Sequence, residues 1–145
     1  MTLDKQTIKD KTRRILDPIV EGLVSLGVPP ILISVLGLIF SFYGAILAAK
    51  GSLFWSGIWL LLSGVCDILD GSVARRSGRS SKFGAFIDST FDRISELVYF
   101  GAILVYYINR SETYPVTMFV VIWVAMGGSI LVSYARARVE GLGES

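Results

Sequence analysis

The strongest constraint on the fold of this chain is a set of long apolar runs separated by short polar segments. Residues 31–49 are almost without polar side chains, and about 20 apolar residues are enough for a helix to cross the hydrocarbon core of a bilayer. The chain has 145 residues, of which 52% are hydrophobic, and its mean hydropathy is +0.61. A soluble domain of this size would carry fewer such runs. The sequence therefore predicts an all-α polytopic membrane protein.

Four transmembrane helices are expected, with short polar turns between them. They cover residues 31–49, 53–66, 83–108 and 115–135. The second run is too short to span a bilayer by itself. We therefore expect its helix to continue to Ala74, through the polar segment that follows it at the membrane surface.

The first 30 residues are expected to form a separate part of the chain, an interfacial amphipathic helix and a linker (residues 1–30) ahead of a membrane core (residues 31–145). Apolar side chains recur at steps of three and four residues, at Ile8, Ile15, Ile19, Leu23 and Leu26. The many charges between them make the segment too polar to span, so a helix in the membrane interface is predicted. A soluble amphipathic helix packed on a partner is the alternative. We expect a division at Asp17-Pro18, because Asp caps helices and Pro suits their first turn.

The distribution of basic residues predicts the orientation in the cell membrane. If the N-terminus is cytoplasmic, the other side holds only Lys50 and Arg110. The cytoplasmic side then holds twelve basic residues: Lys5, Lys9, Lys11, Arg13, Arg14, Arg75, Arg76, Arg79, Lys82, Arg93, Arg136 and Arg138. Cytoplasmic loops carry an excess of Lys and Arg, so we expect the N-terminus and the polar segment after residue 66 on that side.

Four aspartates interrupt the apolar pattern within residues 67–92. Asp67 and Asp70 are three residues apart, and Asp88 and Asp92 are four apart. Each pair therefore lies on one face of a helix, one turn from its neighbour. Carboxylates beside apolar segments repel each other and lose hydration, and divalent cations are the simplest compensation. Exposed acids at a helix end are the alternative explanation for the first pair.

The absence of histidine and the single cysteine, Cys66, narrow the possible chemistry. They exclude a histidine base, a histidine-ligated zinc, a cysteine-cluster metal site and an internal disulfide. A carboxylate site favours magnesium, manganese or calcium. Between the aspartate pairs, Gly71, Ala74 and Gly84 let a ligand approach the backbone, and nearby basic residues supply positive charge for an anion. The segment therefore predicts a metal-bound, phosphate-rich ligand at the membrane edge.

The same segment resembles the signature of the CDP-alcohol phosphatidyltransferases, integral membrane enzymes of phospholipid synthesis. That signature reads D-x-x-D-G-x-x-A-R, then eight residues, then G-x-x-x-D-x-x-x-D. All of its fixed positions are filled here, by Asp67, Asp70, Gly71, Ala74, Arg75, Gly84, Asp88 and Asp92. The resemblance implies a transferase that moves a phosphatidyl-type group from a CDP-linked lipid to an alcohol and releases CMP.

The resemblance also implies a role for each residue of the motif. Two ions, Mg²⁺ or Mn²⁺, would neutralise the donor diphosphate, and their ligands would be Asp67, Asp70, Asp88 and Asp92. Asp92 is also the candidate catalytic base, because an alcohol is a poor nucleophile until it loses its proton. The CDP-lipid would be bound by Asp70, Gly71, Ala74, Arg75 and Gly84.

The acceptor is expected to be a phosphorylated polyol, with inositol phosphate first. Residues 88–93 and 133–141 look like the branch of the family that makes phosphatidylinositol phosphate in actinobacteria and its ether-lipid counterpart in archaea. The glycerophosphate branch usually has Pro and Lys where this chain has Ser89 and Arg93. Arg136 then matches a basic position that holds the acceptor's phosphate, and Arg138 is a second candidate. Positive-inside anchoring is the alternative for both.

Members of the family resemble six-helix proteins that form homodimers. Residues 31–145 are therefore expected to be a C-terminally short core that forms a homodimer. No nucleic acid is expected as a partner. Three alternatives to the inositol phosphate reaction stay open. They are the same reaction with glycerol phosphate or another alcohol, an intramembrane prenyltransferase, and a cation transporter. Prenyltransferase motifs lack the Gly-x-x-Ala-Arg insert, and a basic loop suits an anionic ligand better than a cation path.

Overall fold

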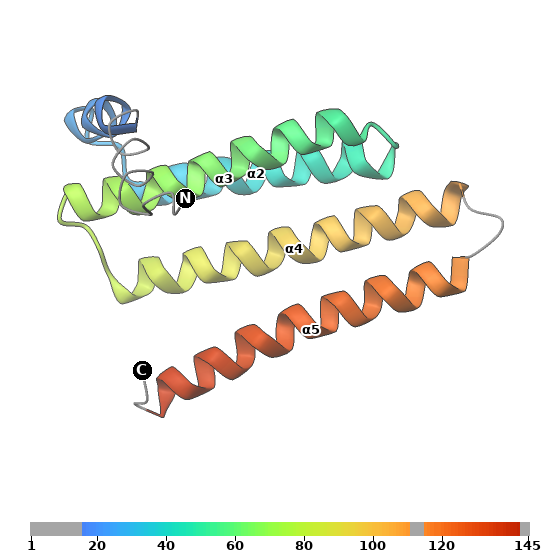
Figure 1. Ribbon diagram of the computed structural model, residues 1–145. Coiled ribbons are helices and arrows are strands. Elements are labelled where there is room, and N and C mark those ends of the chain that lie inside the picture. The colour runs from blue at the N-terminus through green and yellow to red at the C-terminus, as the bar shows by residue number, and fades with distance from the viewer. Residues whose placement is uncertain (1–15, 111–114, 143–145) are drawn as a thin grey trace, which may run out of the picture.

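In a computed structural model the protein is a bundle of long helices, and the structure describes residues 16–110 and 115–142. The residues described within the first helix are 16–25, called here the N-terminal helix. The long helices that follow are α2 (Pro30–Ala49), α3 (Leu53–Arg76), α4 (Lys82–Arg110) and α5 (Pro115–Gly141). Figure 1 shows these four lying side by side, each running opposite to the one before it. The prediction of an all-α polytopic membrane protein is confirmed.

The helix boundaries follow from glycine and proline. Pro29 is extended, and α2 begins at Pro30 because proline fits the first turn of a helix, where its missing N–H is not needed. After α2 and α3, the chain reverses at Gly51 and Gly78, whose φ values are 85° and 67°. Only glycine adopts this left-handed conformation without a steric cost. The helix α3 continues to Arg76, so the predicted extension of the second apolar run through Ala74 is confirmed.

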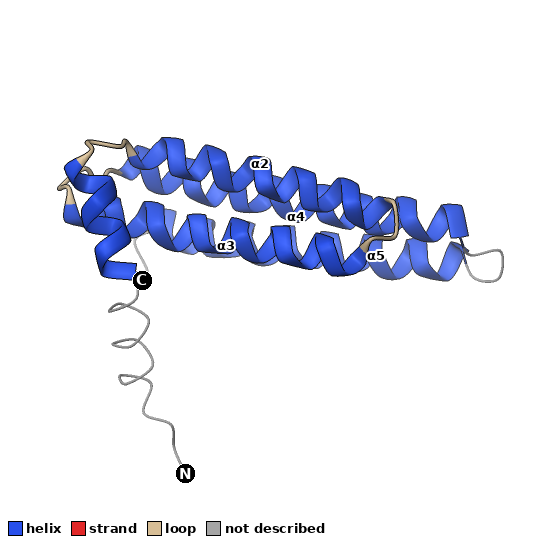
Figure 2. Ribbon diagram, turned by 90° about the horizontal axis from the view of Figure 1, so that it is seen from above, coloured by secondary structure: helices blue, strands red, loops and turns tan. Residues whose placement is uncertain are grey.

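The bundle is arranged around α2, which packs against both α3 and α4, while α5 packs mainly against α4. Figure 2 shows the same arrangement from above. The buried core is small. One cluster joins Val20, Ile33, Cys66 and Val73, and a second joins Ala45, Ala48 and Ala102. Most other large apolar side chains are exposed, as expected of helices that face lipid on their outer sides.

Three of the described helices are long and apolar enough to span a membrane, namely Pro30–Ala49, Leu53–Arg76 and the part of α5 from Val116 to Gly141. Four spans were expected, and the difference is α4. Its sequence is long enough, at 29 residues, but after the initial Lys82 four more charged residues lie in its first half. They are Asp88, Asp92, Arg93 and Glu96. These side chains lower the hydropathy of α4, although the helix lies alongside its neighbours in the bundle (Figure 1).

The N-terminal helix lies across the end of the bundle where α3 ends and α4 begins (Figures 1 and 2). Its contact with the bundle is centred on Val20, which is buried against the first core cluster, whereas Ile19 and Leu26 are exposed. The expected division at Asp17-Pro18 is wrong, because the described helix already includes Leu16 and runs through Pro18. Residues 1–15 lie outside the described part of the chain.

Candidate active site

The two aspartate pairs come together across the contact between α3 and α4. Carboxylate oxygens of Asp67, Asp70 and Asp88 all lie within 4.8 Å of one another. Asp70 is buried, with 6% of its surface exposed, and the other two are more open. Three hard oxygen donors at this separation suit a divalent cation such as Mg²⁺ or Mn²⁺. The residues present therefore fit the metal that the sequence predicts.

Asp70 is held in place from a third helix. The hydroxyl of Ser34 on α2 donates a hydrogen bond to Asp70 Oδ2, with an oxygen–oxygen distance of 2.5 Å. This bond fixes one carboxylate oxygen. Because α2 contributes this contact, the cluster is built by three helices. Sequence analysis missed Ser34, and the available signal was one polar side chain within the otherwise apolar run of residues 31–39.

A cavity of about 220 Å³ opens on one side of the cluster. Its walls include every residue predicted to bind the CDP-lipid, namely Asp70, Gly71, Ala74, Arg75 and Gly84. Asp88 and Ser34 also line it. A Cβ atom on Gly71 would lie 3.2 Å from Arg75 Nη1, so glycine leaves room for the guanidinium beside the backbone. The structure brings the predicted donor-site residues together around one space.

A second cavity, of about 560 Å³, opens on the other side of the cluster. Asp67 and Asp92 line it together with Arg93 and Glu96, and its remaining walls are largely apolar. A small space of about 30 Å³ between the two cavities is lined by all four aspartates. The carboxylate cluster therefore separates the two cavities. Asp92 lies on the side away from Gly71 and Arg75.

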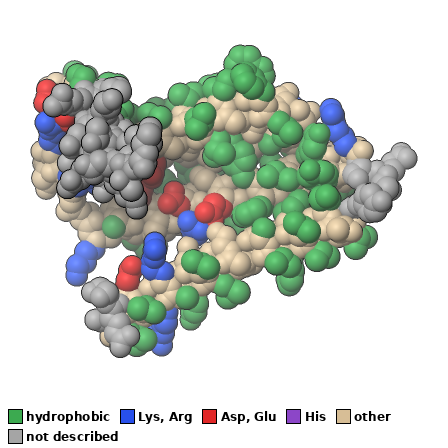
Figure 3. Space-filling model, in the orientation of Figure 1, with side chains coloured by type: hydrophobic (Ala, Val, Ile, Leu, Met, Phe, Trp, Pro, Cys, Tyr) green, Lys and Arg blue, Asp and Glu red, His purple; other side chains and the backbone are tan. Residues whose placement is uncertain are grey.

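On the surface of the molecule, the charged side chains gather mainly at one end of the bundle. In Figure 3, acidic side chains gather in a hollow between the upper and lower helices, near the end of the bundle that the N-terminal helix covers. Basic side chains surround this end, while the visible face beyond it is mainly apolar. A charged site at one end of an apolar bundle fits a ligand that has a polar head and a lipid tail.

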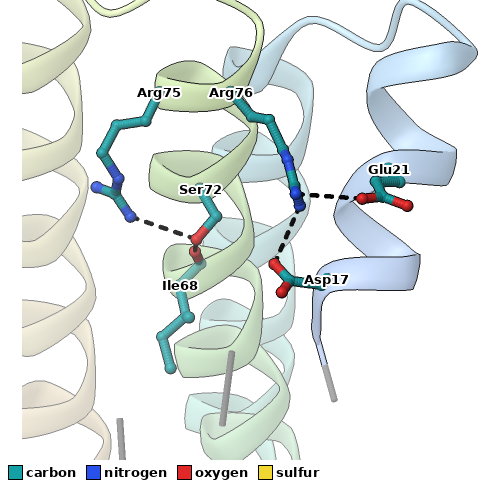
Figure 4. Close-up of polar contacts among 6 residues, drawn as sticks. All are labelled: Asp17, Glu21, Ile68, Ser72, Arg75 and Arg76. Atoms are coloured by element: carbon teal, nitrogen blue, oxygen red, sulfur yellow. Dashed lines mark hydrogen bonds and ion pairs between the residues drawn. The ribbon is translucent and has the colours of Figure 1, made fainter. Parts of the chain in front are cut away.

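Arg75 and Arg76 point in opposite directions from the end of α3 (Figure 4). Arg75 Nη2 donates to the hydroxyl of Ser72 at 3.3 Å and borders the donor-side cavity. Arg76 instead forms ion pairs with Asp17 at 3.0 Å and with Glu21 at 3.1 Å, both on the N-terminal helix. Arg76 therefore ties that helix to α3, and Asp17 serves this contact instead of capping a helix.

The loop between α3 and α4 is tied to the N-terminal segment at a second point. Arg79 Nη1 donates to the backbone carbonyl of Gly27 at 3.2 Å, and Arg79 also lines the donor-side cavity. Arg79 thus connects the loop that follows α3 with the turn that precedes α2. Sequence analysis had no specific role for Arg76 or Arg79.

The two arginines predicted to bind the acceptor lie apart from these cavities. Arg136 and Arg138 are both exposed near the end of α5, and neither lines a cavity described above. The structure therefore brings the aspartates and the donor-site residues together but leaves the predicted acceptor residues outside both cavities. A polar contact between α4 and α5, formed by Arg93, Glu96 and Ser129, was also missed.

The family model described as CDP-alcohol phosphatidyltransferase matches residues 27–143, which include every residue of the cluster and of both cavities. The chain belongs to the CDP-alcohol phosphatidyltransferase family. The resemblance found in the aspartate signature is thereby confirmed. The match also covers α2 and α5, which the signature does not include.

Relatives within the family are named for inositol phosphate chemistry. A phosphatidylinositol phosphate synthase of Streptomyces avermitilis is 34% identical over 90% of this chain and 53% of its own length. An archaetidylinositol phosphate synthase of Pyrococcus horikoshii is also 34% identical, over 92% of this chain and 66% of its own. The chain therefore spans about half to two thirds of the length of these relatives.

A solved structure has the same fold. The crystal structure of Mycobacterium tuberculosis phosphatidylinositol phosphate synthase with CDP-DAG bound superposes with a TM-score of 0.80 at 33% identity, over 90% of this chain and 65% of that one. The same protein in complex with manganese and citrate gives a TM-score of 0.77 at 32% identity, over 87% and 60%. That synthase therefore shares the bundle described above.

Proposed function

We propose that this protein transfers a phosphatidyl-type group from a CDP-linked lipid to the hydroxyl group of a phosphorylated polyol, with inositol phosphate as the expected acceptor, and releases CMP. The observation that carries the proposal is the cluster of Asp67, Asp70 and Asp88, whose carboxylate oxygens lie within 4.8 Å of one another beside a cavity lined by the rest of the family motif. A diphosphate needs both features, a cation site and room against the backbone.

The metal site would consist of the clustered aspartates, with Asp92 as a further ligand on the far side. When bound there, Mg²⁺ or Mn²⁺ supplies the positive charge that stabilises the leaving CMP. The complex of a relative with manganese supports this choice of ion. The proposal includes two bound ions, which the four carboxylates around the small central space support.

The donor head group would bind in the cavity of about 220 Å³. Gly71 and Ala74 leave room there for the phosphates beside α3, and Arg75 can form a charged hydrogen bond with one of them. The hydroxyl of Ser34 keeps the Asp70 carboxylate pointed at the same space. A relative whose crystal structure has CDP-DAG bound supports this class of donor.

Asp92 is the proposed general base. In the reaction, the acceptor oxygen forms a bond to the phosphorus that carries the lipid, the bond from that phosphorus to CMP breaks, and the hydroxyl proton goes to Asp92. The position of Asp92 on the side of the cluster away from Arg75 supports this role, because an attacking group must approach opposite the leaving group.

The acceptor's phosphate would pair with Arg136, and with Arg138 as a weaker candidate. The names of the relatives support inositol phosphate, with a diacyl or an ether lipid as the donor. The proposal also includes a cytoplasmic N-terminus and active site and a homodimer, which the counts of basic residues and the family resemblance support respectively. Analytical ultracentrifugation in detergent tests the dimer.

The proposal is tested by CMP release from the full-length protein in lipid nanodiscs. CDP-diacylglycerol and its ether-lipid counterpart are each mixed with inositol phosphate, glycerol phosphate, free inositol or serine, with Mg²⁺ present. We expect CMP release to be fastest with inositol phosphate. Fastest release with glycerol phosphate or an uncharged alcohol would change the acceptor but keep the donor half. No CMP release with any acceptor, together with metal-ion flux in liposomes, would replace the proposal with a transporter.

A further inference from the structure

The helix α5 is held to the bundle by one described polar contact. Arg93 Nη1 on α4 donates to the hydroxyl of Ser129 on α5 at 2.9 Å. The same Arg93 pairs with Glu96 one turn along α4, and Ser129 also donates to Glu96. The three side chains thus form a closed triangle between the two helices. Among the described helices, α5 packs mainly on α4, so this triangle lies at its principal contact.

The surroundings make this contact specific. The rest of α5 is largely apolar, and apolar side chains can slide along one another at little cost because lipid is equally apolar. A polar triangle has a single register in which its hydrogen bonds form. The side chains of Arg93 and Glu96 are 35% and 40% exposed, so the triangle is partly shielded from its surroundings. The triangle therefore fixes how far α5 is shifted and rotated relative to α4.

This register determines which residue of α5 lies beside the aspartates. Arg136 is seven residues after Ser129, which is about two helical turns along the same face. The helices run in opposite directions (Figure 1), and Asp88 lies five residues before Arg93 and eight before Glu96. Equal steps along antiparallel helices bring Arg136 level with Asp88. Arg138 is nine residues from Ser129, about half a turn away from that face.

We propose that Arg93, Glu96 and Ser129 are positioning residues, which hold Arg136 on the side of α5 that faces the aspartate cluster. The inference rests on the proposed function, because it gives the acceptor's phosphate a cation at a fixed distance from Asp92. Arg93 and Glu96 line the same cavity as Asp92, so two members of the triangle border the space beside the proposed base. The triangle thereby sets acceptor affinity without touching the donor.

The test is Ser129→Ala, which removes the link between the helices and leaves the Arg93–Glu96 pair on α4 intact. Its control is Thr117→Ala, which removes an exposed hydroxyl from the same helix three turns away. We expect Ser129→Ala to raise the half-saturating inositol phosphate concentration about three- to tenfold, as for loss of one hydrogen bond, and to leave that of the CDP-lipid unchanged. Ser129→Thr, which keeps a hydroxyl group, should restore most of the affinity.

A double-mutant cycle with Arg136→Ala separates positioning from general stabilisation. If the triangle acts through Arg136, Ser129→Ala has no further effect on acceptor affinity in the Arg136→Ala background. If Ser129→Ala lowers acceptor affinity by the same factor in the original chain and in Arg136→Ala, the inference is overturned. A simultaneous loss of donor affinity in Ser129→Ala would also overturn it.

A readout that does not depend on turnover keeps this inference apart from the proposed function. Hydrogen–deuterium exchange is measured over residues 120–141 in Ser129→Ala and Thr117→Ala. Faster exchange in Ser129→Ala alone supports the triangle as the contact that fixes α5, even if no CMP is released. Unchanged exchange in Ser129→Ala overturns the inference, even if the transferase activity is confirmed.

Discussion

Ser34 on α2 and Asp70 on α3 are joined by a hydrogen bond of 2.5 Å, although they are 36 residues apart in the chain. The bond connects the central helix of the bundle with the most buried carboxylate of the cluster. A free carboxylate rotates about its last torsion, so this hydroxyl group selects the orientation in which Asp70 meets Asp67 and Asp88. The metal site thus depends on a helix that contributes no aspartate.

Ser34→Ala should weaken both metal and CDP-lipid binding, because Asp70 loses the donor that orients it. A hydrogen bond to a charged group is worth about 1.5–3 kcal/mol, or roughly one to two decades in affinity. The control is Ser41→Ala, two turns along the same helix, where the buried hydroxyl has no partner among the described residues. Binding isotherms for Mn²⁺ and the CDP-lipid make the comparison. Equal effects of the two changes would contradict the role of Ser34.

The local features of the fold could be predicted from the sequence because they depend on short patterns. Apolar runs give the helices, short polar segments between them give turns such as the one at Gly51, and three- and four-residue spacings put each aspartate pair on one helix face. The signature then predicted which residues would surround one cavity. These inferences need no knowledge of how the helices are arranged.

Contacts between distant segments could not be predicted in this way. Ser34 is one polar residue in an apolar run, and nothing in its neighbours indicates that it meets Asp70. Arg76 looks like any basic residue of a cytoplasmic loop, yet it pairs with Asp17 and Glu21. The same holds for Ser129. Their partners are decided by helix packing, which a single sequence does not reveal.

Arg75→Ala and Arg76→Ala should differ sharply, although the residues are adjacent. Arg75 borders the donor-side cavity, so its loss should raise the half-saturating CDP-lipid concentration by about one to two decades. The ion pairs of Arg76 are exposed, and such pairs contribute at most about 1 kcal/mol. Arg76→Ala should therefore leave donor affinity nearly unchanged. Steady-state kinetics on both variants measures this difference. A similar loss of donor affinity in both would contradict the assignment of Arg75 to the donor site.

Gly37→Ala should destabilise the bundle. A Cβ atom at this position would lie 2.9 Å from the Cβ atom of Cys66, so α2 and α3 would have to move apart. Overpacking of this kind typically costs about 1–3 kcal/mol. Gly57→Ala is the matched control, because nothing lies within 4 Å of the added atom. Thermal unfolding in detergent should show a lower midpoint for Gly37→Ala alone, and equal midpoints would mean that the two helices are not closely packed here.

Asp92→Asn should abolish most of the turnover and leave CDP-lipid binding largely intact. Loss of a general base lowers a rate by about 10²–10⁴-fold, and asparagine cannot accept the hydroxyl proton. Asp17→Asn, on the N-terminal helix, removes an exposed carboxylate as a control. Single-turnover CMP release measures the chemical step. A rate within a few-fold of the original would assign the base to another residue.

The most direct test of the central claim is a CDP-lipid binding titration of the full-length protein in nanodiscs, with Mg²⁺ and with a chelator, for the original chain and for Asp88→Asn. The claim is that Asp67, Asp70 and Asp88 hold a cation that the donor diphosphate requires. We expect tight binding only for the original chain with Mg²⁺, and weak binding for Asp88→Asn whether or not the metal is present. Undiminished binding in the chelator, or a Mg²⁺ response in Asp88→Asn equal to that of the original chain, would contradict a donor held through these three carboxylates.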